Sequence, residues 1–330
     1  MKVAVLGTGG WGTALALLAA SQDNRVVLWG HAFDRVQEIR RTRANSGHLP
    51  DIMLPAEIHL TSAIEDCGKQ DLVMFVTPSL ALREVAHQLR PALKNARTIL
   101  LSCTKGIEHG TGMRMSEILA EQFPGNPIAV LSGPNLAIEV ARGLPTATVL
   151  GSREQTVAAK LQQALGGPRF RIYTSHEIVG IELGGALKNI FAVAAGVSDG
   201  FRLGDNSKAA LVTRALAELI RLGVAMGGDA RTFQGLSGAG DLMATCFSPH
   251  SRNRRLGEQL GHGKTLAEIT SGAQTVAEGI PTARSAFECA RRLSIETPII
   301  DQVYAVLYEK KSPAQAMHDL LERDQKSERG

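Results

Sequence analysis

The chain has 330 residues, enough for about two domains of ordinary size, so a small scaffold held together by disulfides is excluded. With 36 Lys and Arg against 32 Asp and Glu the net charge is +4, and 44% hydrophobic and 21% charged residues are ordinary values for a globular protein. The composition therefore excludes disordered and fibrous proteins, and the small net charge selects no class of partner.

The four cysteines, Cys67, Cys103, Cys246 and Cys289, form no Cys-x-x-Cys pair. This spacing predicts reduced thiols and gives no pattern for a metal site. An apolar strand pattern begins one residue after Met1 and leaves no room for a signal peptide. We therefore expect a cytoplasmic protein without a bound metal ion.

Short apolar runs alternate with helical patterns over the first 175 residues. Strands are predicted at 2–7, 25–29, 71–76, 98–103, 128–133, 146–150 and 169–174, with helices between them, for example at 12–20, 79–89 and 112–122. The earlier runs are continuously apolar, which is typical of buried parallel strands. The alternation predicts an α/β fold with a Rossmann-type doubly wound sheet.

From residue 176 onwards the pattern is helical only. Helices are predicted at 178–197, 207–226, 251–260, 279–293, 299–308 and 313–321. We therefore expect a dinucleotide-binding α/β domain over 1–175, an all-α substrate domain over 176–321 and a disordered polar tail over 322–330.

The segment Gly7-Thr8-Gly9-Gly10-Trp11-Gly12 matches the GxGxxG pattern between the first strand and the first helix. In this context Gly7 permits a tight turn, Gly9 lets the backbone approach a pyrophosphate, and Gly12 lets the helix pack on the strand. The helix N-terminus adds unpaired N–H groups for the anion. We therefore predict a dinucleotide-binding turn, and a turn without a ligand fits this βαβ context less well.

The end of the second strand, Val27-Leu28-Trp29-Gly30-His31, lacks the acidic residue that holds the ribose hydroxyls of NAD. His31 and Arg35 can accommodate a 2′-phosphate, although both also fit a solvated loop and helix face. The nearby Asp34 keeps a preference for NAD open. The sequence thus favours NADPH as the cofactor, with NADH as the alternative.

Two loops follow buried strands at the edge of the sheet where ligands bind in such folds. Thr104-Lys105-Gly106 supplies a positive charge for an anionic substrate or for the nicotinamide side of the cofactor. Ser132-Gly133-Pro134-Asn135 supplies close backbone and amide contacts. Either loop alone fits an ordinary strand-to-helix connection, and their shared position predicts a binding role.

The predicted helix 178–197 is apolar except for Glu182, Lys188 and Asn189. The helical neighbours of Lys188 are small or apolar, so burial is expected to lower its pKa and suit it to proton transfer at a carbonyl or alcohol. Two structural alternatives stay open: the side chain reaches solvent, or it pairs with Glu182. A membrane span is rejected because of the interior charges and the missing basic flanks.

The run Ser251-Arg252-Asn253-Arg254-Arg255 begins a helix, with Ser251 as the N-cap and arginines suited to a phosphate. Upstream, Gly238-Ala239-Gly240-Asp241 is expected to form a flexible turn whose carboxylate meets a substrate hydroxyl or orients Lys188. The arginines also fit a solvated helix face. These arginines are the only feature of the sequence that favours binding to nucleic acid. The indication is weak, because no aromatic residues are interleaved with them.

Taken together and in this order, the glycine turn, Lys105, the Ser-Gly-Pro turn, Lys188-Asn189, Gly240-Asp241 and the Ser-Arg-Asn run resemble the soluble bacterial NAD(P)-dependent glycerol-3-phosphate dehydrogenases over about residues 2–321. The resemblance implies a Rossmann domain followed by a helical domain like that of 6-phosphogluconate dehydrogenase. It implies reduction of dihydroxyacetone phosphate to sn-glycerol 3-phosphate for phospholipid synthesis, a homodimer, and no nucleic-acid partner.

By position, the resemblance makes Lys188 the proton donor or acceptor. Substrate contacts are implied for Lys105, Gly133, Asn135, Asp241, Ser251, Arg252 and Asn253, and dinucleotide contacts for Gly10, Trp11, His31, Lys105, Ala137, Arg252, Val276 and Glu278. Asn135 stands where a hydroxyl-bearing residue is common and Leu136 where Phe is, which puts single contacts in question but not the reaction.

Two other functions are compatible with parts of this pattern. One is a reductase of the same architecture acting on ketopantoate or a β-hydroxyacid, whose substrates carry no phosphate for Arg252. The other is a dinucleotide-sensing regulator that binds nucleic acid through its arginines, which has no use for Lys188 in an apolar helix.

Overall fold

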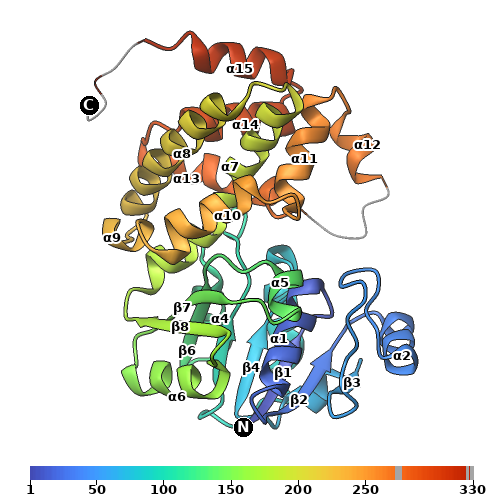
Figure 1. The fold of residues 1–330 in the computed structure, drawn as a ribbon. Coiled ribbons are helices and arrows are strands. Elements are labelled where there is room, and N and C mark those ends of the chain that lie inside the picture. Colours follow the sequence, from blue (N-terminus) through green and yellow to red (C-terminus); the bar gives the residue numbers. More distant parts are fainter. Residues whose placement is uncertain (272–276, 325–326, 328–330) are drawn as a thin grey trace.

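The computed structural model describes residues 1–271, 277–324 and 327. A sheet flanked by helices forms one unit, and a bundle of helices forms the other (Figure 1). The bundle sits over the carboxyl ends of the central strands, so the ligand-binding edge of the sheet faces it. Most of the predicted tail, 325–326 and 328–330, lies outside the described residues.

The sheet has eight strands in the order β3-β2-β1-β4-β5-β6-β7-β8. Their bounds are β1 Lys2–Leu6, β2 Arg25–Trp29, β3 His59–Thr61, β4 Leu72–Phe75, β5 Ile99–Ser102, β6 Ile128–Ser132, β7 Thr146–Ser152 and β8 Phe170–Ser175. Neighbours are parallel except for β6 and β7. The order reverses between β1 and β4, which confirms the predicted Rossmann-type sheet. The three-residue β3 is too short to show a pattern in the sequence and was not predicted.

The alternation of side chains in β1 explains why helices cover both faces of the sheet. Val3 and Val5 enter one apolar cluster, and Ala4 and Leu6 enter another on the opposite face. The helices of this unit are α1 Gly10–Ala20, α2 Phe33–Thr42, α3 Leu82–Leu89, α4 Met115–Gln122, α5 Ala137–Ala141 and α6 Gln155–Leu165, with short 3₁₀ turns η1 Ile64–Cys67 and η2 Ser79–Ala81.

The helical unit is built around α7, Ile178–Gly200. The remaining elements are α8 Asp205–Ala225, α9 Ala230–Phe233, the π-helical turn η3 Leu236–Gly240, α10 Asp241–Phe247, α11 Arg252–Gly261, α12 Leu266–Thr270, α13 Gly279–Leu293, α14 Pro298–Tyr308 and α15 Pro313–Leu321. Within the described ranges, only α7 is long and apolar enough to cross a membrane, and 89% of its most apolar window is buried inside the protein. Because neighbouring helices surround it, α7 is apolar on every side as the core helix of the bundle.

Helices α7 and α11 touch through their backbones. A Cβ atom on Gly196 would lie 1.9 Å from the carbonyl oxygen of Arg254, and one on Gly257 would lie 1.9 Å from that of Val193. Only glycine fits at positions 196 and 257, because any side chain there would push the two helices apart. The close approach sets the N-terminus of α11 beside the middle of α7.

The loop after β5 is part of the sheet unit by sequence but packs with the bundle. Ile107 is 2% exposed and belongs to the apolar cluster of the helical unit. The Ser285 hydroxyl of α13 donates to the carbonyl oxygen of Ile107 at 3.0 Å. The loop is therefore anchored to α13 immediately after Lys105.

Candidate active site

The glycine turn between β1 and α1 has the geometry that a pyrophosphate needs. Gly7 has φ +128°, and a Cβ there would lie 2.6 Å from the carbonyl oxygen of Val76. A Cβ on Gly12 would lie 1.9 Å from the Gly7 carbonyl oxygen. Gly9 is the N-cap residue of α1 and has no side chain to cap the helix, so the first N–H groups of the helix face the turn unblocked. A dinucleotide phosphate fits this cradle.

The other residues that are predicted to contact the cofactor differ in how they are placed relative to this turn. The methyl group of Ala137, at the start of α5, is 3.7 Å from where a Cβ on Gly10 would sit. The buried Nε1 of Trp11 has no hydrogen-bond partner in the described chain. His31 is exposed beyond the end of β2. Val276 lies outside the described residues.

Glu278 connects the two units. Its carboxylate accepts hydrogen bonds from the Ser79 backbone N–H at 3.0 Å and from the Ser79 hydroxyl at 2.5 Å. A Cβ on Gly106 would lie 2.3 Å from the Cβ of Ser79, so this contact also requires a glycine in the Lys105 loop. Sequence reasoning did not identify Ser79, which has no motif of its own.

Two lysines share the carboxylate of Asp241, which is 2% exposed. Lys105 Nζ lies 2.6 Å from Asp241 Oδ2 and 2.9 Å from the Gly133 carbonyl oxygen. Lys188 Nζ lies 2.8 Å from Asp241 Oδ1. The fold thus brings four predicted substrate or catalytic residues, from the loops after β5 and β6 and from α7 and α10, into one cluster.

Thr245 is a member of this cluster that the sequence analysis missed. Its hydroxyl donates to the Asp241 carbonyl oxygen at 2.6 Å, so its oxygen accepts from Lys188 Nζ at 2.5 Å. The available signal was its position four residues after Asp241, one helical turn away. Thr245 and Asp241 together fix the direction of the Lys188 side chain.

The pairing of Lys188 with Glu182, an open alternative from the sequence, is wrong. Glu182 accepts from the Arg114 guanidinium at 2.8 Å and from the Ser116 backbone N–H at 2.8 Å. Glu182 therefore ties α7 to the start of α4. Lys188 is also 7% exposed, so it does not reach solvent either.

Burial is the main cause that lowers the pKa of Lys188, to about 8. The Asp241 carboxylate opposes this shift, and the neighbouring Lys105 ammonium adds to it. Since the group then gains or loses a proton close to neutral pH, it suits acid–base work at an oxygen atom.

The segment before Asp241, expected to be a flexible turn, is instead the buried π-helical turn η3. Ser237 is 1% exposed, and a Cβ on Gly238 would lie 2.0 Å from the carbonyl oxygen of Phe233. A Cβ on Gly184 of α7 would lie 2.6 Å from the Ser237 carbonyl oxygen. The glycines therefore serve close packing, and they hold Asp241 rigidly against α7.

The arginines at the start of α11 have different surroundings. The Ser251 side chain caps the helix by accepting from the Arg254 N–H at 3.2 Å. Arg254 Nε lies 2.5 Å from Asp199 Oδ2, so this arginine is structural, and Arg255 is exposed. Arg252 is exposed, and Glu278 and His48 are close enough to interact with its charge.

Two predicted substrate amides are engaged within the protein. Asn253 Nδ2 donates to Asn189 Oδ1 at 2.8 Å, and Asn253 Oδ1 accepts from the Gly279 N–H at 2.9 Å. Asn135 Oδ1 accepts from the Thr148 hydroxyl at 3.0 Å. Asn253 therefore connects α11 with α7 and α13, and Asn135 is held against β7, whatever contacts these amides make to a substrate.

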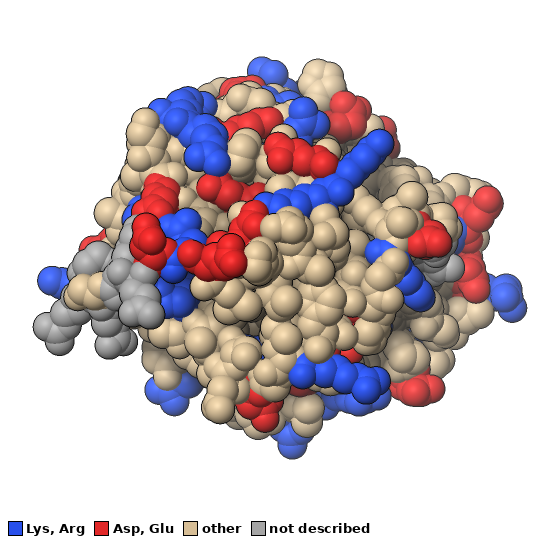
Figure 2. Space-filling view, turned by 90° about the horizontal axis from the view of Figure 1, so that it is seen from above, with Lys and Arg blue, Asp and Glu red and all other residues tan. Residues whose placement is uncertain are grey.

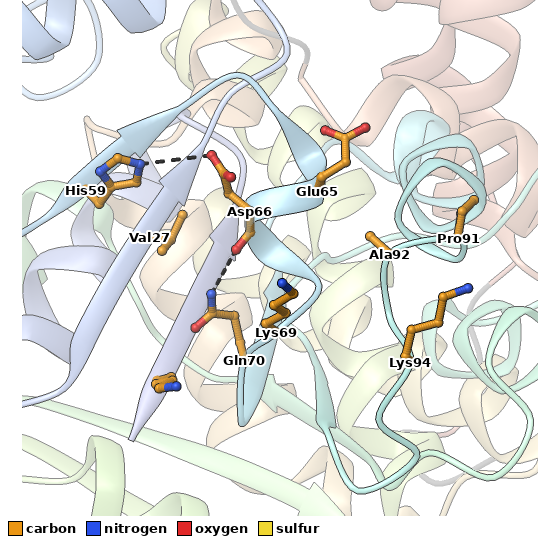
Figure 3. Close-up of a pocket in the computed structure, with 10 residues that line it drawn as sticks. Val27, His59, Glu65, Asp66, Lys69, Gln70, Pro91, Ala92 and Lys94 are labelled. Carbon is orange, nitrogen blue, oxygen red and sulfur yellow. Dashed lines mark hydrogen bonds and ion pairs between the residues drawn. The ribbon is translucent and has the colours of Figure 1, made fainter.

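The remaining surface features of the described chain lie away from this cluster or carry no comparable group of functional side chains. A cavity of about 710 Å³ opens at the amino ends of the strands, on the opposite edge of the sheet (Figure 3). Its lining side chains include Lys2, His59, Asp66, Lys69 and Lys94. The face of the bundle in Figure 2 shows acidic and basic side chains interspersed, without a basic stripe. Across the described ranges, no group of three or more His, Cys, Asp or Glu side chains is placed to hold a metal ion.

A Rossmann sheet whose phosphate turn faces a bundle carrying a buried lysine defines a two-domain, nicotinamide-dinucleotide-dependent dehydrogenase. Family models described as the N-terminus and the C-terminus of NAD-dependent glycerol-3-phosphate dehydrogenase match residues 2–158 and 177–318. The chain belongs to the NAD-dependent glycerol-3-phosphate dehydrogenase family. This finding confirms the predicted family, the oxidoreductase class and a nicotinamide dinucleotide as cofactor.

Individual relatives agree with this assignment. Glycerol-3-phosphate dehydrogenase (NAD(P)+) of Syntrophotalea carbinolica is 46% identical over 332 residues, covering 99% of each chain. The crystal structure of a glycerol-3-phosphate dehydrogenase from Coxiella burnetii matches with TM-score 0.94 and 39% identity, over 98% of this chain and 99% of that one. A ketopantoate reductase from Ralstonia eutropha matches with TM-score 0.61 and 17% identity, over 96% of this chain and 100% of that one, and shares the fold only.

Proposed function

We propose that the protein reduces dihydroxyacetone phosphate to sn-glycerol 3-phosphate, with Lys188 as the proton donor. The observation that carries this proposal is the Lys188–Asp241–Lys105 cluster beside the dinucleotide edge of the sheet, in which Lys188 and Asp241 are buried. A bound NADH or NADPH supplies the hydride for the carbonyl carbon. The residues of the chain bind the substrate, orient it and move the proton.

The proton moves between Lys188 Nζ and the substrate oxygen. With its pKa near 8, the Lys188 ammonium is mostly protonated at pH 7 and can donate to the alkoxide oxygen as it forms. Asp241 holds the ammonium through Oδ1 while Oδ2 binds Lys105. The Lys105 ammonium is a second positive charge beside Lys188, and it stabilises the negative charge that develops on the substrate oxygen.

The phosphate of the substrate is assigned to Arg252 at the start of α11. A guanidinium beside a helix N-terminus offers bidentate and dipolar binding to a phosphate. The glycine contacts between α7 and α11 fix the distance from this anchor to Lys188. Binding the remote phosphate therefore holds the carbonyl in line with the acid. Ser251, Asn253, Asn135 and Gly133 remain predicted substrate contacts.

The test compares substrates at a fixed cofactor concentration. We expect oxidation of NADPH, followed at 340 nm, with dihydroxyacetone phosphate and not with ketopantoate. Equal turnover of the unphosphorylated substrate would contradict the role of Arg252 and favour the ketopantoate reductase reaction. A homodimer and a cytoplasmic location stay predictions, as does the preference for NADPH over NADH.

A further inference from the structure

The segment 43–58, here called the strap, connects α2 to β3 and covers the glycine turn. His48 of the strap lies against the turn: its Cδ2 atom is 3.9 Å from the Cβ position of Gly9. Its own Cβ is 3.8 Å from the Cβ position of Gly10. The imidazole is therefore at the one glycine that must stay bare for a pyrophosphate to approach.

The strap is fixed in this place by Asn45, which is 2% exposed. Its Nδ2 donates to the Thr8 carbonyl oxygen at 2.8 Å and to the Thr13 hydroxyl at 2.8 Å. The first contact holds the turn and the second holds α1. The position of His48 over the turn is thus set by a buried amide and not by a surface loop alone.

Arg35 determines which nitrogen of His48 carries the proton. The Arg35 NH2 group donates to Asn45 Oδ1 at 2.9 Å and lies 2.8 Å from His48 Nδ1. An arginine can only donate, so Nδ1 must accept, and the neutral ring then keeps its proton on Nε2. A doubly protonated ring would place an N–H against an N–H. Burial lowers the pKa of His48, and the charges of Arg35 and Arg252, which face it from α2 and α11, lower it further.

The protonated nitrogen is on the side of the ring that faces the turn. Nε2 is bonded to Cδ2, the atom that approaches Gly9. The ring also interacts with the backbone of Gly47, which raises the pKa of His48 against the effect of burial and of the two arginines, and His48 is half-buried rather than withdrawn. A neutral donor is therefore aimed at the space above Gly9 and the unblocked N-terminus of α1.

We propose that His48 is a neutral hydrogen-bond donor to the dinucleotide phosphates, and that Arg35 locks its tautomer instead of reading a 2′-phosphate. The proposal rests on the dinucleotide site of the proposed function, but not on the identity of the carbonyl substrate. It revises the sequence-based role of Arg35, because a tautomer lock serves NADH and NADPH equally.

The first experiment measures the dissociation constants of NADH and NADPH, without carbonyl substrate, by nucleotide fluorescence. His48→Ala is expected to weaken both about tenfold, the effect of one hydrogen bond to a charged group. His48→Gln, whose amide N–H can occupy a similar place, should restore part of the affinity. Arg35→Ala should weaken both cofactors by the same factor, and the exposed His87→Ala serves as the matched control. Selective loss of NADPH in Arg35→Ala would overturn the proposal.

The second experiment tests the protonation state. Calorimetry of NADH binding at pH 6.5, in buffers of different ionisation enthalpy, should show no proton uptake, because the donor is already neutral. Nitrogen NMR should show the proton on Nε2 in the unchanged protein and exchange between both tautomers in Arg35→Ala. Uptake of a full proton would overturn the proposal. Intact cofactor binding without turnover of dihydroxyacetone phosphate would contradict the proposed function only.

Discussion

The dinucleotide turn and the lysine cluster are built in opposite ways. The turn consists of backbone: four glycines and a helix N-terminus within six consecutive residues. The lysine cluster consists of side chains from the loop after β5, from α7 and from α10, and its shared carboxylate is 136 residues from one lysine and 53 from the other. In the glycine turn, an added side-chain atom would collide with the backbone or with the bound phosphate. In the lysine cluster, the positive charges of the two lysines depend on the negative charge of Asp241.

The largest expected effect comes from removal of the Lys188 side chain, which should impair the lysine cluster and leave the dinucleotide turn intact. Lys188→Ala should lower kcat by about 10²–10⁴, because the proton for the alkoxide is lost, while the dissociation constant of NADPH stays nearly unchanged. Steady-state kinetics and fluorescence titration of the same preparation check both parts. Near-normal turnover would show that the proton comes from another group.

The backbone site can be tested with two glycines that differ in free space. Gly12→Ala should unfold the turn, because the new Cβ would lie 1.9 Å from the Gly7 carbonyl oxygen. Gly9→Ala meets nothing nearer than 3.9 Å within the protein, so its thermal stability should be normal. Its methyl group would occupy the path of the pyrophosphate and weaken NADPH binding. Equal melting temperatures for the two variants would contradict this distinction.

The substrate anchor should separate binding from chemistry. Arg252→Ala should raise the KM for dihydroxyacetone phosphate by about 10- to 100-fold, the loss of a charge-assisted phosphate contact. The exposed Arg255→Ala is the matched control for net charge. An equal rise in KM in both variants would show that the positive charge of the helix matters in general, and that Arg252 makes no specific contact with the phosphate.

The smallest expected effect is a shift along the pH axis. Reduction should decline as the pH rises through the Lys188 pKa of about 8, because the acid loses its proton, and oxidation of glycerol 3-phosphate should increase over the same range. The Asp241 carboxylate raises this pKa, so Asp241→Asn should move both limbs to lower pH. Profiles of kcat measured in both directions check the sign. A shift to higher pH would contradict the assignment.

The same contrast explains what the sequence predicted. The turn lies in one motif, so its glycines and its place between strand and helix were correctly predicted. Lys188 was singled out because a charge in an apolar helix is conspicuous. Ser79 and Asn45 had no such signal, since their contacts join segments far apart in the chain, and Thr245 had only its position one helical turn after Asp241. The glycines before Asp241 were misread as flexible because a glycine permits close packing as readily as mobility.

The anchoring of Ile107 in the bundle has a mechanical consequence. Lys105 is two residues from that anchor, so a rotation of the bundle away from the sheet would carry Lys105 along with Asp241 and Lys188. Such a rotation would bend the segment between β5 and Lys105, and it would break the Lys105–Gly133 and Ser79–Glu278 contacts. Such a rotation would open the dinucleotide edge of the sheet while Lys105, Asp241 and Lys188 stayed together.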